Sequence, residues 1–179
     1  LASVPTDRLV QGATAADYDR DGDLDLLVLE WDIRPVPTDV DRTKGACELM
    51  SGGTSGLEDP AGNLSRLFEN DGTGHFIDVT ADRSLDLYEV VAFTGQFVDV
   101  TGDGWDDLLV TGDACTSRLY RNDEGKRFVD ITDDAGVGTD ENGMGSVVRD
   151  IDGDGRPDWL VTSIGYDSGS EPCPSTGPL

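Results

Sequence analysis

The sequence predicts an all-β protein made of short antiparallel strands that repeat along the chain. An aspartate-rich pattern occurs three times, a strand-turn-strand segment occurs twice, and nearly all the acidic residues are Asp. Of the 37 acidic residues, 29 are Asp and 8 are Glu. Asp favours turns and hard-cation loops, whereas helix surfaces favour Glu. The composition therefore indicates a turn-rich β protein with cation-binding loops.

Charge and hydrophobicity exclude several classes of partner. The 179 residues carry a formal net charge of -24, which would repel nucleic acid and an anionic membrane surface. No run of about 18 apolar residues exists, so the sequence predicts no membrane-spanning helix. Hydrophobic residues make up 36% of the chain. An acidic, halophile-like surface is the alternative explanation of the charge, and composition alone leaves it open.

The repeated aspartate pattern is Asp-x-(Asp/Thr)-x-Asp-Gly-x-x-Asp, followed by three apolar residues. Oxygen ligands at positions 1, 3 and 5, a Gly at position 6 and a backbone carbonyl at position 7 suit Ca²⁺. Position 7 varies in residue type, as expected if only its carbonyl binds, and position 9 is always Asp. The alternative is a set of ion-free Asp-Gly turns, which would leave four clustered carboxylates to repel one another. The predicted metal-binding residues are Asp17, Asp19, Asp21, Asp23 and Asp25; Asp99, Thr101, Asp103, Trp105 and Asp107; and Asp150, Asp152, Asp154, Arg156 and Asp158.

An EF-hand loop begins in the same way but is excluded by the later positions of the pattern. An EF-hand needs a Glu at position 12 and a helix on each side. Position 12 is occupied here by Val28, Val110 and Val161, and strand-forming residues surround it. The three loops are therefore predicted to join strand to strand.

The second repeated segment predicts a β-hairpin. Residues 66–80 match residues 118–132 with a constant offset of 52, and each copy has an Asn-Asp turn between two β-forming runs. Short apolar runs follow the aspartate loops, and residues 95–98 and 145–148 lead into two of them. Each repeat thus holds about four short strands. A four-stranded unit that recurs about every fifty residues is typical of a propeller blade.

The repeats divide the chain into a partial propeller of about two and a half to three blades. The first covers about residues 9–81 and contains an insertion at 31–63, the second covers 91–133, and the third, 143–179, is truncated before its hairpin. Propellers have about four to eight blades. The rest of a propeller, or other copies, is therefore expected to be needed to close the ring.

Both motifs and their order resemble the FG-GAP, or VCBS, repeat family, which includes integrin α-subunit propeller blades and the cartilage acidic protein group. The resemblance covers about residues 12–162 without the insertion. It implies a Ca²⁺-stabilised β-propeller, usually of seven blades and usually extracellular, here with about three ions. Thr101 departs from the pattern by replacing an Asp, so the second site is expected to be weaker.

Other residues add less. The three cysteines, Cys47, Cys115 and Cys173, follow the apolar strands in similar loops, and a disulfide between two of them is expected in an oxidising setting. His75, the only histidine, is expected to face solvent rather than to act in catalysis. Trp31 opens the insertion and is either a packing residue or a binding anchor.

The sequence therefore predicts a non-catalytic extracellular calcium-binding module for adhesion or for binding a protein or glycan partner. Its insertion is the expected contact surface, because long loops on a rigid scaffold tend to carry function. Two alternatives remain open at this point: a propeller segment appended to a secreted enzyme such as a polysaccharide lyase or hydrolase, and a subunit of a surface filament.

Overall fold

The computed structural model describes residues 10–31, 65–87, 90–113, 115–140 and 142–164. Within these residues, ten strands form three antiparallel sheets, and the helical structure is one short turn, α2 (Thr132–Ala135). This confirms the predicted all-β class. No helix in the described part is long and apolar enough to cross a membrane.

The first two sheets have four strands each, paired in chain order, and the third has two in the described residues. The first sheet contains β1 (Val10–Ala16), β2 (Asp25–Glu30), β3 (Arg66–Asn70) and β4 (Phe76–Asp78). The second contains β5 (Val91–Val98), β6 (Asp107–Asp113), β7 (Arg118–Asn122) and β8 (Phe128–Asp130). The third contains β9 (Gly143–Arg149) and β10 (Asp158–Ser163).

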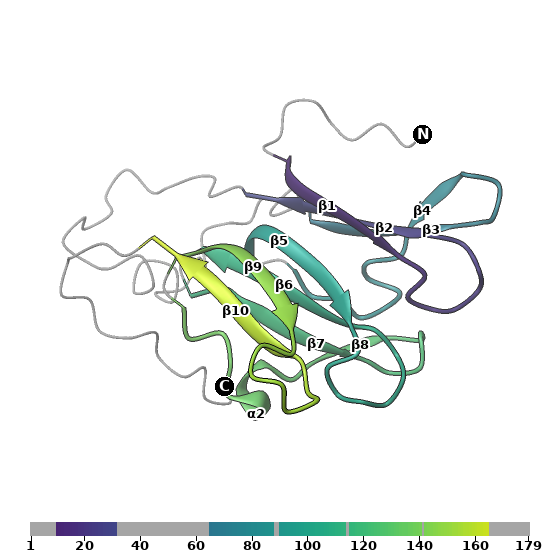
Figure 1. Ribbon diagram of the computed structural model, residues 1–179. Helices are drawn as coiled ribbons and strands as arrows, with labels where there is room; N and C mark the ends of the chain where they lie inside the picture. Colours follow the sequence, from purple (N-terminus) through teal and green to yellow (C-terminus); the bar gives the residue numbers. More distant parts are fainter. Residues whose placement is uncertain (1–9, 32–64, 88–89, 114, 141, 165–179) are drawn as a thin grey trace, which may run out of the picture.

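The first strands of the three sheets lie next to one another. β5 contacts β1 on one side and β9 on the other (Figure 1). Glycine permits the close approach of β1 and β5, because a Cβ on Gly12 would lie 2.6 Å from the carbonyl oxygen of Phe93. The sheets therefore stack face to face, and the turns after β1, β5 and β9 lie along one side of the molecule, the lower right of Figure 1.

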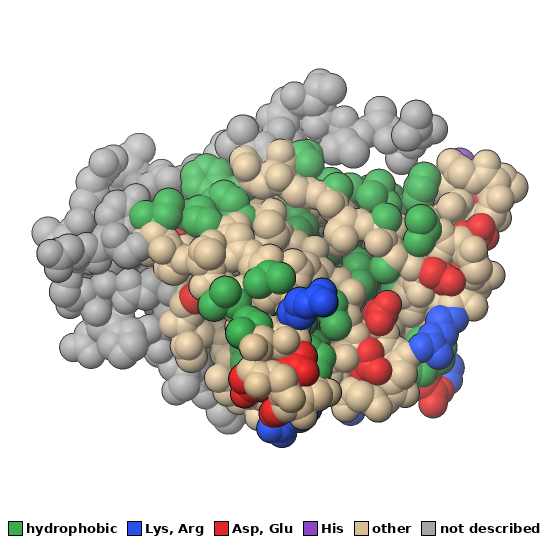
Figure 2. Space-filling view, in the orientation of Figure 1, with side chains coloured by type: hydrophobic (Ala, Val, Ile, Leu, Met, Phe, Trp, Pro, Cys, Tyr) green, Lys and Arg blue, Asp and Glu red, His purple; other side chains and the backbone are tan. Residues whose placement is uncertain are grey.

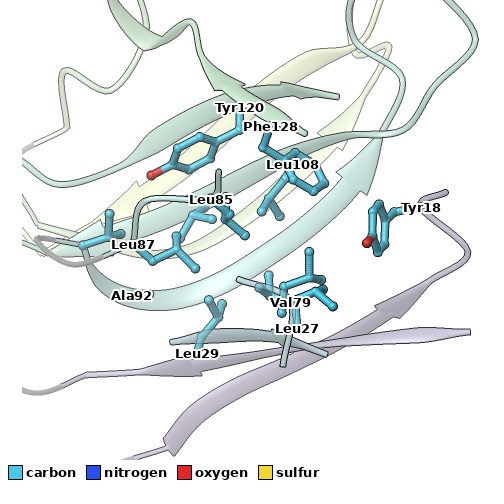
Figure 3. Packing of buried hydrophobic residues seen from close by; sticks show 13 residues of the cluster. Tyr18, Leu27, Leu29, Val79, Leu85, Leu87, Ala92, Leu108, Tyr120 and Phe128 are labelled. Carbon is cyan, nitrogen blue, oxygen red and sulfur yellow. The ribbon is translucent and has the colours of Figure 1, made fainter. Parts of the chain in front are cut away.

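The apolar core lies between the first and second sheets (Figure 3). Leu27 and Leu29, two residues apart on β2, share one face and are fully buried. Leu108 and Val110 on β6 meet them from the second sheet, and the rings of Tyr18 and Phe128 lie 5.5 Å apart at one end. Burying each such side chain contributes about 1.5–3 kcal/mol, so this interface dominates the stability of the described fold.

The contact between the second and third sheets is more polar. Gln96 Nε2 donates to the backbone oxygen of Ser146 over 2.8 Å, and the hydroxyls of Thr94 and Ser146 lie 3.3 Å apart. The outer face of the third sheet is open within the described residues. Leu160 is 53% exposed, although the equivalent Leu109 is 1% exposed beneath the third sheet.

The predicted strands are present, with one correction at their ends. The sequence predicted strands through Thr80 and Thr132, but β4 and β8 end two residues earlier. The reason is that each threonine uses its hydroxyl in place of a ladder partner: Thr80 Oγ1 accepts the amide of Leu67, and Thr132 Oγ1 accepts the amide of Leu119. Thr132 then begins α2. The aspartate loops join strand to strand, as predicted.

We predict that Asn122→Ala destabilises the protein by about 2–4 kcal/mol, because it removes three hydrogen bonds of a fully buried side chain, one of which, to Tyr18, joins the two large sheets. Asn122 is fully buried; its Nδ2 donates to the backbone oxygens of Tyr18 and Asp106, and its Oδ1 accepts the amide of Gly125. Urea unfolding monitored by circular dichroism would measure the loss.

The matched control is Asn70→Ala, at the equivalent position of the first sheet. Asn70 is only half-buried, and its side chain bonds Leu24, Gly72 and Gly74 within its own sheet and loops. It should cost about 1 kcal/mol. Equal losses in the two variants would contradict a special role for the contact between sheets.

Candidate metal centre

The first aspartate loop, between β1 and β2, gathers carboxylates around one point. One oxygen from each of Asp17, Asp19 and Asp21 lies within 4.8 Å of the others. The loop's own amides orient these groups: the amide of Gly22 donates to Asp17, and that of Asp21 donates to Asp19, both over 3.2 Å. The backbone thus holds like charges together, an arrangement that a bound cation would stabilise.

Asp25 completes this loop and is 1% exposed. Its Oδ1 accepts the amide of Asn70 over 3.0 Å, whereas its Oδ2 is buried without a hydrogen-bond partner among the described residues. Asp17 Oδ1 is also buried without a hydrogen-bond partner among the described residues. Buried polar atoms are normally satisfied, so two unpartnered carboxylate oxygens beside one acidic cluster fit the oxygen ligands of a hard cation.

The pKa of Asp25 reflects this environment. Burial raises it from 3.8 to about 6, and the charges of Asp19 and Asp21 add to the shift, while backbone hydrogen bonds from Asn70 and Tyr18 oppose it. Burial also raises the pKa of Asp19. Without a cation, the ionised loop is therefore electrostatically unfavourable.

The third loop, between β9 and β10, has a similar cluster in a more exposed setting. Oxygens of Asp150, Asp152 and Asp158 lie within 4.8 Å of one another. Asp154 instead pairs with Arg156 over 2.7 Å, and this ion pair lowers its pKa. The structure thus brings together three of the four aspartates predicted for this site.

The second loop, between β5 and β6, does not form such a cluster in the described residues. Its carboxylates are already used by backbone amides: Asp99 accepts those of Gly102 and Gly104. Asp107 Oδ2 accepts two further amides and its Oδ1 accepts that of Asn122. Both oxygens of the buried Asp107 are thus already bonded to amides.

The variable seventh positions have different surroundings. Trp105 packs under the guanidinium of Arg20, whose Cζ lies 4.6 Å from the ring centroid. Asp23 lies against the β3–β4 turn of its own sheet, because a Cβ on Gly72 in that turn would lie 2.7 Å from Asp23 Oδ2. Arg156 pairs with Asp154. The three side chains at position 7 therefore share no common role.

Sequence reasoning missed several residues that support the loops. Ser65 and Ser117 occupy equivalent positions and accept the amides of Glu30 and Gly112, which fixes β2 and β6 against the next strand. Arg83 was also missed; it bonds Tyr18 and Glu69 and lies 3.8 Å from Asp19. The two serines could have been found from the sequence, because they are 52 residues apart, the offset of the hairpin repeat. Arg83 could not, because the second repeat has no arginine at the equivalent position.

The histidine, the cysteines and Trp31 lie apart from the aspartate clusters. The side chain of His75 is 70% exposed and lies 3.6 Å from Asp71, as expected for a turn residue. Cys115 is disulfide-bonded, and its partner lies outside the described residues, as do Cys47 and Cys173. The insertion lies outside them too, apart from Trp31. The Trp31 ring packs 6.1 Å from that of Phe93, and its Nε1 donates to Asp113.

We predict that, in chelator, the melting temperature falls as the pH rises from 3.8 towards about 6, and that Asp25→Asn reduces this fall. The pKa of Asp25 is higher in the folded than in the unfolded chain, so the folded state binds its proton more tightly. That contribution is present at low pH and is lost as the pH rises through the folded pKa. Scanning calorimetry at several pH values would measure it.

Asp71→Asn is the control of opposite sign. The Thr73 hydroxyl and amide lower the pKa of Asp71, so its contribution is lost as the pH falls. Asp25→Asn should change the slope in one direction and Asp71→Asn in the other. A pH profile unaltered by Asp25→Asn would contradict the assignment of this carboxylate.

Comparison with known proteins matches the second loop and the third sheet to one family. The model of the FG-GAP-like repeat matches residues 99–161. A search of curated proteins found no match. The matched segment runs from the first aspartate of the second loop to Val161 in β10, so it contains both the hairpin of the second sheet and the third aspartate loop. Residues 99–161 of this chain are therefore similar to an FG-GAP-like repeat, the family that the sequence motifs resembled.

Proposed function

We propose that this chain is part of an extracellular, Ca²⁺-binding β-propeller module that binds a protein or glycan partner without catalysing a reaction. The observation that carries the proposal is the cluster of one oxygen each from Asp17, Asp19 and Asp21 within 4.8 Å, in a loop that ends at the buried carboxylate of Asp25. Burying a carboxylate is costly unless hydrogen bonds, a cation or a proton compensate it.

The donor set favours Ca²⁺ over other metals. The ligand groups are carboxylates, Thr101 and backbone carbonyls, with no His or Cys in the loops. Ca²⁺ accepts six to eight oxygens in flexible geometry, whereas Zn²⁺ prefers nitrogen and sulfur. Each bound ion would also neutralise two charges of a strongly acidic chain. Acidic side chains gather along the lower and right margins of the face in Figure 2, the side on which the loops lie.

The sheet arrangement supports a propeller. Two sheets of four antiparallel strands stack face to face, each sheet begins at the strand nearest its neighbour, and the family match spans the second and third sheets. We propose that further repeats or other copies complete the ring. The open face of the third sheet, where Leu160 and Val147 are exposed, supports this, because the equivalent Leu109 is covered by a neighbouring sheet.

An extracellular location follows from the proposed ions. Loops of this kind in extracellular modules bind Ca²⁺ at about 10⁻⁴–10⁻³ M, far above cytosolic levels. The disulfide at Cys115 supports an oxidising setting. For partner binding, we retain the insertion at 31–63 as the contact surface, because long loops on a rigid scaffold tend to carry function. Trp31 at its start packs against Phe93, which favours a packing role for this residue.

We predict that millimolar Ca²⁺ raises the melting temperature by several degrees relative to chelator. A ligand that binds only the folded state contributes about 2.7 kcal/mol at a hundredfold excess over its dissociation constant. Asp17→Asn combined with Asp21→Asn should reduce the response, while Asp71→Asn, in an exposed turn, should preserve it. Identical melting curves of the parent protein in Ca²⁺ and in chelator would refute the proposed function.

We also predict that the second loop loses Ca²⁺ first when chelator is added. It has one carboxylate fewer because of Thr101, and its Asp107 already accepts three amides. Thr101→Asp should strengthen binding there and move the second loop later in the order. Calorimetric titration of variants that retain a single intact loop would rank the sites. Loss of the first site before the second would contradict this ranking.

A further inference from the structure

The first aspartate loop is in contact with the second sheet as well as with its own. Asn122, at the end of β7, donates from Nδ2 to the backbone oxygen of Tyr18 over 2.9 Å. Gly125, in the β7–β8 turn, lies so close that an added Cβ would be 2.8 Å from Asp19 Cα and 3.1 Å from Trp105 Cζ3. The backbone of the loop therefore rests on the hairpin of the neighbouring sheet.

Two arginines strengthen the same junction. Arg20, in the first loop, has a left-handed backbone with φ of 62° and stacks on Trp105 of the second loop. Arg83 lies between Tyr18, Glu69 and Asp19, and its backbone oxygen accepts the amide of Phe128 in β8. Both arginines thus connect the first loop to the second sheet.

The third loop provides an internal contrast. Arg156 is turned towards Asp154 of its own loop, whereas Arg20 of the first loop stacks on Trp105 of the second. Among the described residues, no neighbouring hairpin rests on it as the β7–β8 turn rests on the first loop. Two loops with the same sequence pattern therefore have different support.

We propose that the β7–β8 turn and Trp105 of the second sheet position the first loop for Ca²⁺, so that binding at this loop and docking of the two sheets stabilise each other. This inference rests on the proposed function. Gly125 and Asn122 hold the backbone at Asp19 and Tyr18, and Trp105 holds Arg20, so moving the turn would move the ligands. Coupling of this kind is reciprocal.

Gly125→Ala tests the proposal, and Gly136→Ala is its matched control. Both glycines have a left-handed backbone, with φ of 72° and 66°, so both variants pay a similar conformational cost. A Cβ on Gly136 meets nothing within 4 Å, whereas one on Gly125 displaces Asp19. Ca²⁺ affinity is measured by calorimetry in full-length protein in which Asp99→Asn and Asp150→Asn disable the other two loops.

We expect Gly125→Ala to weaken Ca²⁺ binding at the first loop about tenfold relative to Gly136→Ala, which is about 1.4 kcal/mol. In the reciprocal measurement, Ca²⁺ should raise the melting temperature of Gly125→Ala less than that of Gly136→Ala. Equal affinities in the two variants would overturn the coupling while leaving the proposed function intact. Absence of Ca²⁺ binding in the parent protein would overturn the proposed function itself.

Trp105→Leu provides a second test if Gly125→Ala does not fold. It removes the ring beneath Arg20 but retains the backbone carbonyl of the second loop. The proposal requires weaker binding at the first loop and unchanged binding at the third, each measured in protein with only that loop intact. Equal weakening at both loops, or none at the first, would contradict it.

Discussion

The fold depends on one buried carboxylate at the start of the second strand of each large sheet. Asp25 begins β2 and Asp107 begins β6, and each accepts the amide of the asparagine that ends the third strand, Asn70 or Asn122. One side chain thus joins an aspartate loop, a core strand and the start of a hairpin turn. Burying a carboxylate is costly unless hydrogen bonds or a cation compensate it. In the second sheet three amides supply this compensation, whereas in the first sheet one oxygen of Asp25 is left for another partner.

This difference gives the two loops different properties although their sequences share the same pattern. The second loop satisfies its carboxylates internally and is suited to hold β5 and β6 in register. The first loop retains unsatisfied oxygens, an unfavourable arrangement that a divalent cation would relieve. The apolar core between the first two sheets holds the loop and the β7–β8 turn together, so the stability of that core and the geometry of the proposed cation site are linked.

The proposed role as a binding module requires rigidity more than reactivity. Stacked sheets would provide a fixed platform if cations brace their loops as proposed, and the strongly acidic chain disfavours partners that are themselves anionic. The difference between the first interface and the outer face of the third sheet fits a module in which each sheet packs on the next. The first interface is apolar and closed, while the third sheet retains an apolar outer face of the kind that its neighbours bury.

The all-β class, most of the strands and the strand-to-strand aspartate loops could be predicted from the sequence, because strand-forming runs and turn residues act locally. The sequence also located the repeated Arg, Asn, Asp and Thr of the hairpins, which bond at equivalent positions: Arg66 with Asp78, and Arg118 with Asp130. Three facts could be known only from the folded structure: which carboxylates converge, that amides satisfy Asp107, and that Gly125 and Arg83 lie close to Asp19. Those facts depend on how one sheet stacks on the next, and a repeat pattern fixes the conformation of each unit without fixing the contacts between residues a hundred positions apart.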